Sequence, residues 1–185
     1  MPVAFIIIAV LVVLLIIFVV SIYNSLIALR NQVKNSWAQI DVELQRRFDL
    51  IPNLVETVKG YAKHEDAVLT KVTDLRSSWA TAETVSEKAH LENELSSALK
   101  TIMAVAENYP DLKANTNFLS LQDELTNTEN KLSASRETYN NVTTTYNTKL
   151  EVFPNNIVAS MFHFKQEDLF EVENEEVKKN VKVSF

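Results

Sequence analysis

The chain opens with an unbroken apolar stretch. Residues 3–20 are almost all Val, Ile, Leu and Phe, and the first charged side chain is that of Arg30. A helix of about 20 apolar residues spans the ~30 Å hydrocarbon core of a bilayer. The stretch therefore predicts a transmembrane anchor over residues 1–25, with a span that begins at Val3 and ends at Tyr23. A cleaved signal peptide is the alternative, but the stretch is long for one and no basic segment precedes it.

Beyond the anchor, apolar residues recur at steps of three and four in four segments, which is the period of an amphipathic helix. These stripes begin at Leu26, Val68, Leu91 and Phe118, and the first one runs through Val55 as far as Tyr61. Pro52 interrupts the first stripe and predicts a kink, because proline has no amide hydrogen. The last stripe continues to Phe153. The pattern predicts an all-α protein in which an N-terminal transmembrane helix is followed by an antiparallel four-helix bundle of long helices over residues 26–164.

The C-terminal part breaks this periodicity. An apolar segment at residues 157–164 predicts one more short helix, and residues 165–185 form an acidic tail. The last five residues alternate between apolar and polar, which is typical of an extended arm. This arm lies on the bundle or is free; the sequence leaves both open.

Composition excludes several classes of protein. The 185 residues include one Gly and no Cys, and the formal net charge is -6. Glycine-rich phosphate loops and cysteine-based sites cannot be built from such a chain. An acidic chain without a basic cluster also lacks the cations that bind nucleic-acid phosphates, so we expect no nucleic-acid partner.

Cations flank the anchor on one side only. Arg30, Lys34, Arg46 and Arg47 follow it. Positively charged flanks tend to stay in the cytoplasm. We therefore expect a single-pass protein of the cell membrane, with its N-terminus outside and its helical body in the cytoplasm.

Candidate chemistry is sparse. Glu87 and His90 have the i, i+3 spacing of a ligand pair in di-iron helix bundles, but a complete site needs a second such pair and two more Glu. A solvated helix face explains the pair equally well. We therefore predict no metal site, no cofactor and no catalytic residue.

Several longer motifs point to a family. The chain carries QRRFDLIPNLV at residues 45–55, YPDLKAN at 109–115, RETYN at 136–140 and FHF at 162–164. With these blocks it resembles the LemA family of bacterial membrane-anchored proteins along nearly its whole length. The resemblance implies one N-terminal span, a cytoplasmic helical bundle and no established catalytic activity. Relatives associated with membrane organelles also suggest a membrane-organising role.

Polar residues within the matched blocks are the candidate functional residues. They are Arg47, Asn53, Glu129, Asn130, Arg136, Tyr139 and Asn140. One interpretation is a partly buried network that fixes the register between the first and fourth helices. The other is a recognition surface for a partner.

The sequence therefore predicts a membrane-anchored cytoplasmic scaffold or adaptor rather than an enzyme. Its partner would be an unidentified membrane or cytoplasmic protein, and a homo-oligomer is possible. One alternative is a self-assembling, membrane-organising protein. A second is a metal-dependent or hydrolytic enzyme that uses carboxylates inside the bundle.

Overall fold

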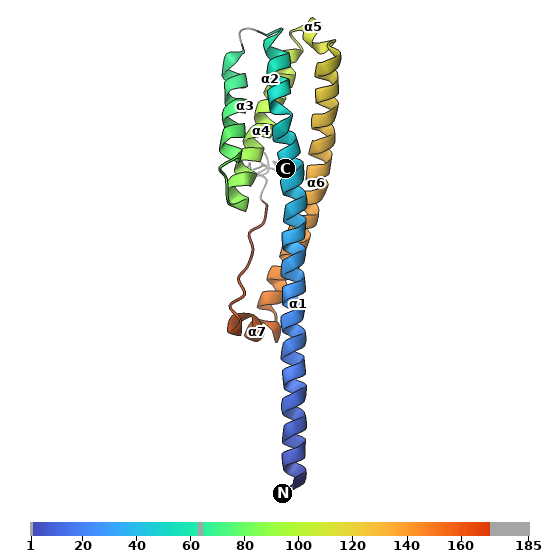
Figure 1. The fold of residues 1–185 in the computed structure, drawn as a ribbon, viewed down its shortest axis with the longest axis vertical. Coiled ribbons are helices and arrows are strands. Elements are labelled where there is room, and N and C mark those ends of the chain that lie inside the picture. Colours follow the sequence, from blue (N-terminus) through green and yellow to red (C-terminus); the bar gives the residue numbers. More distant parts are fainter. Residues whose placement is uncertain (1, 63–64, 171–185) are drawn as a thin grey trace, which may run out of the picture. The chain divides into compact units, whose positions relative to one another are not determined.

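The computed structural model describes residues 2–62 and 65–170, and in these residues all regular structure is helical (Figure 1). The helices are α1 (Pro2–Asp49), α2 (Ile51–Lys59), α3 (Asp66–Trp79), α4 (Val85–Ala106), α5 (Pro110–Lys113), α6 (Thr116–Glu151) and α7 (Asn155–Met161). The prediction of an all-α protein with a long apolar N-terminal helix is confirmed. The antiparallel four-helix arrangement stays a prediction. His64, most of the acidic tail and the terminal arm lie outside the described residues.

The predicted kink at Pro52 is an interruption two residues earlier. α1 ends at Asp49 and α2 begins at Ile51. Proline cannot donate the hydrogen bond to the carbonyl four residues back, so the ladder fails here. The Leu50 amide donates instead to the Arg47 carbonyl, three residues back, at 3.3 Å.

The break also moves the apolar stripe. Leu54 is fully buried, whereas Val55, which the three-and-four spacing placed in the core, is half-buried. Tyr61 is exposed, because α2 ends before it. Its hydroxyl accepts a hydrogen bond from the Asn115 side chain at 2.9 Å.

The described chain divides into two compact units. The first unit consists of Met1–Gln39 and Ser135–Leu169, and the second is built from Ile40–Ala134 together with Phe170. α1 begins in the first unit and ends in the second, whereas α6 begins in the second unit and ends in the first.

The second unit has a core built around stacked aromatic rings. Phe48 of α1 stacks on Trp79 of α3, with ring centroids 4.8 Å apart. α3 packs against both α2 and α4. The Lys88 ammonium of α4 lies 4.6 Å from the centroid of the Trp79 ring and pairs with Asp41 of α1. Phe48 and the Lys88 ammonium therefore both contact the ring of Trp79.

In the first unit, α1 begins as a bare apolar helix. Except for Val19, every Val, Ile, Leu and Phe from residue 3 to 20 is 49% to 71% exposed. Burial begins at Ile22 and is complete at Leu26. The Tyr23 ring contacts Phe162, with centroids 4.7 Å apart. One helix thus passes from a side-chain surface with no packing to a packed one within about one turn.

The end of α6 departs from the predicted stripe. The helix ends at Glu151, and Phe153, which the spacing placed in the core, is 78% exposed. The prediction is wrong there because Pro154 stops the helix before the stripe is complete. The short helix that follows begins at Asn155 and ends at Met161, earlier than expected.

A capping box fixes the start of α4. The Thr84 hydroxyl accepts a hydrogen bond from the Glu87 amide at 3.1 Å, and the Glu87 carboxylate accepts from the Thr84 amide at 3.0 Å. Amide hydrogen bonds from Thr84 and Glu83 lower the pKa of Glu87. The segment between α3 and α4 therefore ends in a defined helix start.

The variant Thr84→Ala is expected to lower the free energy of unfolding by about 1 kcal/mol, because it removes the acceptor that caps α4. Chemical denaturation of the purified chain in detergent measures this change. Thr101→Ala, an exposed change in the middle of α4, is the matched control and should leave stability nearly unchanged. Equal losses in the two variants would contradict the capping role.

Candidate functional site

The structure divides the seven candidate residues between the two units. Those in the second unit are Arg47, Asn53, Glu129 and Asn130, and those in the first unit are Arg136, Tyr139 and Asn140. Each group is therefore described in its own unit.

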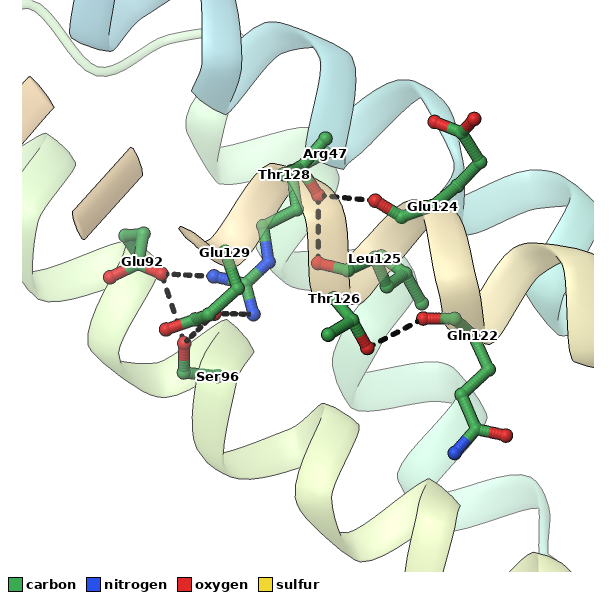
Figure 2. A network of polar contacts seen from close by, with 9 residues as sticks. All are labelled: Arg47, Glu92, Ser96, Gln122, Glu124, Leu125, Thr126, Thr128 and Glu129. Atoms are coloured by element: carbon green, nitrogen blue, oxygen red, sulfur yellow. Dashed lines mark hydrogen bonds and ion pairs between the residues drawn. The ribbon is translucent and has the colours of Figure 1, made fainter. Parts of the chain in front are cut away.

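A buried ion cluster forms in the second unit, where it links α1, α4 and α6 (Figure 2). Arg47 is 4% exposed, and its two terminal nitrogens pair with different carboxylates. Nη1 donates to Oε1 of Glu92, and Nη2 pairs with Oε2 of Glu129. The Ser96 hydroxyl donates to the same Glu92 oxygen at 2.9 Å and lies 3.5 Å from Glu129 Oε2.

The two carboxylates of this cluster have different surroundings. Glu92 is 0% exposed, whereas the side chain of Glu129 is 43% exposed. A carboxylate removed from water costs several kcal/mol unless a cation and hydrogen bonds compensate. Arg47 and Ser96 supply that compensation to Glu92. Glu129 neutralises the guanidinium from the solvent side, so one carboxylate of the cluster is buried and the other is partly exposed to solvent.

Sequence reasoning missed Glu92. A signal for it was present, because Glu92 lies three residues before Leu95 and seven before Leu99, on the buried face of α4. A carboxylate at a core position predicts a buried cation on a neighbouring helix. Arg47 lies close in sequence to the interruption before Pro52, and its guanidinium binds these two carboxylates.

A groove of about 370 Å³ lies next to this cluster, between α4 and α6. Leu99, Met103 and Leu125 give it an apolar floor. The polar lining comes from Arg47, Ser96, Lys100, Gln122, Thr126 and Glu129. Figure 2 shows Gln122, Thr126 and Glu129 along α6. An apolar floor with a charged and polar rim matches the chemistry of a protein-binding surface.

Asn53 lies in a second groove of about 630 Å³, between α2 and the start of α6. The side chains of Asn115 and Tyr61 are hydrogen-bonded there. Its lining is mostly uncharged and polar, with Asn117 and Ser120 on α6. Asn130 is exposed on α6 and lines neither of these two grooves.

In the first unit, α6 binds the chain that follows α7. Tyr139 is almost fully buried, and its hydroxyl donates to the Asp168 carbonyl at 2.7 Å. Tyr146 donates to the Lys165 carbonyl at 3.1 Å. Asn147 both donates to the Glu167 carbonyl, at 2.8 Å, and accepts from its amide, at 3.0 Å.

Burial raises the pKa of both tyrosines, and nearby Glu167 adds to the rise. Each phenol therefore keeps the proton that it donates to the carbonyl of Asp168 or Lys165. Arg136 and Asn140 are half-buried in the same unit. Tyr146 and Asn147 also bind the segment that follows α7, although they were not among the candidate residues.

The residues of the suspected half metal site have other partners. Glu87 belongs to the capping box, and Nε2 of His90 lies 3.3 Å from Oε1 of Glu94. Within residues 2–62 and 65–170, no three His, Cys, Asp or Glu side chains are grouped so that they could hold a metal ion.

Comparison with known proteins gives one consistent result. The sequence profile of the LemA family matches residues 36–185. Protein LemA of Metamycoplasma hominis is 27% identical, over 74% of this chain and 63% of that protein. Magnetosome protein MamQ 2 of Paramagnetospirillum magneticum is 25% identical, over 80% of this chain and 64% of that protein. The chain thus spans less than two thirds of the length of these relatives.

The variant Arg47→Met is expected to destabilise the chain by about 3–5 kcal/mol, because it leaves the buried Glu92 carboxylate without its cation. Arg46→Met is the matched control. Arg46 pairs with Glu124 at 2.7 Å, but both side chains are nearly half exposed, so its loss should cost less than about 1 kcal/mol. Chemical denaturation compares the two, and the double variant Arg47→Met/Glu92→Leu should recover much of the loss. Similar effects of the two single variants would contradict this account of the cluster.

Proposed function

Given that this chain belongs to the LemA family, we propose that it is a membrane-anchored, non-catalytic scaffold that binds another protein in the cytoplasm. Its body is an antiparallel four-helix bundle. The observation that carries the proposal is the bare apolar run of α1, which continues without a break into a packed helix that ends at Asp49.

The bare run fits a bilayer in length and in composition. The helix from Val3 to Tyr23 is ~31 Å long at 1.5 Å per residue, close to the ~30 Å of a hydrocarbon core. From residue 3 to residue 20 its side chains have no partner within the described chain that would hide them from water, since all the large ones except Val19 are exposed. Lipid would remove this surface from water. The run is the one helix of the described residues that is long and apolar enough to span a membrane.

Anchoring changes how a binding surface works. A body held at the membrane shares two dimensions with other membrane proteins, so its effective concentration for them rises without any new contact. Weak binding at an open groove is then sufficient. The α4–α6 groove suits this role because its floor is apolar and Lys100, Gln122 and Thr126 line it.

A second candidate function is self-assembly that organises the membrane. The similarity to relatives named as magnetosome proteins favours it. In that case the α4–α6 groove would bind a second copy of this chain instead of a different protein.

Photo-crosslinking in intact cells distinguishes the two functions. A photoreactive residue at Thr126 is expected to capture a distinct membrane or cytoplasmic protein. The exposed neighbour Asn127, which does not line the groove, should capture much less of it. Lys100→Glu should abolish capture, whereas Lys131→Glu, the same charge change elsewhere on the helical surface, should not. A ladder of self-crosslinks would favour self-assembly, and the absence of any groove-dependent product would contradict both.

The orientation is tested by cysteine labelling, since the chain has no native Cys. Ser133→Cys, exposed on α6, is expected to resist an impermeant thiol reagent in intact cells and to react after lysis. Pro2→Cys should react with the same reagent in intact cells, because the cations Arg30 and Lys34 favour a cytoplasmic body and hence an N-terminus outside. Labelling of Ser133→Cys in intact cells would overturn this topology.

A further inference from the structure

The corner between α6 and α7 is unusually apolar for a surface. It is formed by residues 152–162, which we call the α7 corner, and none of them is charged. Glu151 precedes the corner and His163 follows it. An uncharged surface segment of this length is unusual for a soluble protein, where exposed helices are rich in charge.

The large side chains of the α7 corner are turned to the outside. Val158 and Ala159 are buried and attach α7 to its unit. Phe153 is 78% exposed and Ile157 is 56% exposed. Three further large apolar residues of the corner are also exposed, namely Val152, Met161 and Phe162. All five lie within eleven consecutive residues, and groups of exposed apolar side chains mark sites of contact with a partner or a membrane.

The α7 corner lies beside the end of the bare apolar run. Figure 1 shows α7 next to α1, within the first unit. The Tyr23 ring, which ends the predicted span, lies 4.7 Å from the Phe162 ring and 5.7 Å from the Phe164 ring. The corner therefore shares a level along α1 with the point at which burial begins.

We propose that the exposed face of the α7 corner inserts into the lipid interface beside the span and forms a second membrane contact. This inference rests on the proposed function, because it requires α1 to cross the bilayer. With residues 3–20 in the hydrocarbon core, Tyr23 lies at the boundary between acyl chains and headgroups. Aromatic rings favour that boundary, and the side chains of Phe153 and Phe162 are placed to enter it.

Continuity favours lipid over a protein as the occupant. The exposed surface of the α7 corner begins where the lipid-facing surface of α1 ends, so one environment covers both. Charged groups lie on either side of the corner rather than in it. Lys149 donates to Ser25 at 2.8 Å, and the Arg30 guanidinium lies 5.4 Å from the Phe164 ring. Such cations lie at headgroup level and also attract anionic lipids. Burial of apolar side chains at the boundary between headgroups and acyl chains is what stabilises interfacial segments.

The test uses the full chain in vesicles of phosphatidylethanolamine and phosphatidylglycerol. Single cysteines replace Phe153, Ile157, Leu14 or Leu119, and each carries a polarity-sensitive fluorophore. A spin-labelled lipid quenches the fluorophore either near the headgroups or near the bilayer centre. Leu14 reports the span itself, and Leu119 is an exposed apolar position on α6 in the other unit. Circular dichroism checks that each labelled chain keeps its helix content.

The shallow quencher is expected to remove emission at Phe153→Cys and Ile157→Cys, whose spectra should also shift to the blue. The deep quencher should act on Leu14→Cys, and neither quencher should act on Leu119→Cys. If Leu14→Cys is quenched but both corner positions are not, the second contact is wrong while the anchor stands. If Leu14→Cys is not quenched, the anchor itself fails. An unquenched Ile157→Cys that forms disulfide-linked dimers on oxidation would assign the corner to a second copy.

Discussion

The guanidinium of Arg47 is buried, and a cation that is removed from water must be neutralised by carboxylates close to it. Its charge is neutralised from two other helices at once, by Glu92 of α4 and Glu129 of α6. Apolar packing alone would allow these helices to slide by a turn, since Leu and Ala repeat along their faces. A shift of that size would leave a bare charge inside the second unit, so we expect the ion cluster to oppose it.

In the first unit, backbone groups rather than a charge need partners. The segment that follows α7 is not helical, so its N–H and C=O groups lack helical hydrogen bonds. α6 provides neutral partners for them through Tyr139, Tyr146 and Asn147. A neutral hydrogen bond tolerates a mixed environment better than an ion pair, because it has less hydration to lose. This difference suits a unit that also carries an apolar helix with an exposed surface.

The sequence predicted the helices well and the exceptions poorly. The three-and-four spacing located four helical segments, and Pro52 marked the break between α1 and α2 to within two residues. The start of α4 at Val85 and the short helix α5 were not predicted. The spacing placed Tyr61 and Phe153 in the core, but both are exposed. In each case the helix ends before the stripe does, so the three-and-four period no longer predicts which side chains are buried. Of the candidate site, Arg47 and Glu129 were named from the chain alone. Their partner Glu92 was not named, although its spacing from Leu95 and Leu99 places it on the buried face of α4; which cation it would meet there depends on how the helices pack, and the sequence alone does not give that.

The interruption at Leu50 has a mechanical consequence. Tension applied to the apolar end of α1 is carried along a continuous ladder of backbone hydrogen bonds as far as Asp49, where the ladder stops. Arg47 lies two residues before that stop and forms ion pairs with α4 and α6. Part of a load that reaches this point therefore passes from α1 to α4 and α6 through the ion pairs, as shear between side chains. Because an ion pair can re-form after it breaks, this coupling is reversible.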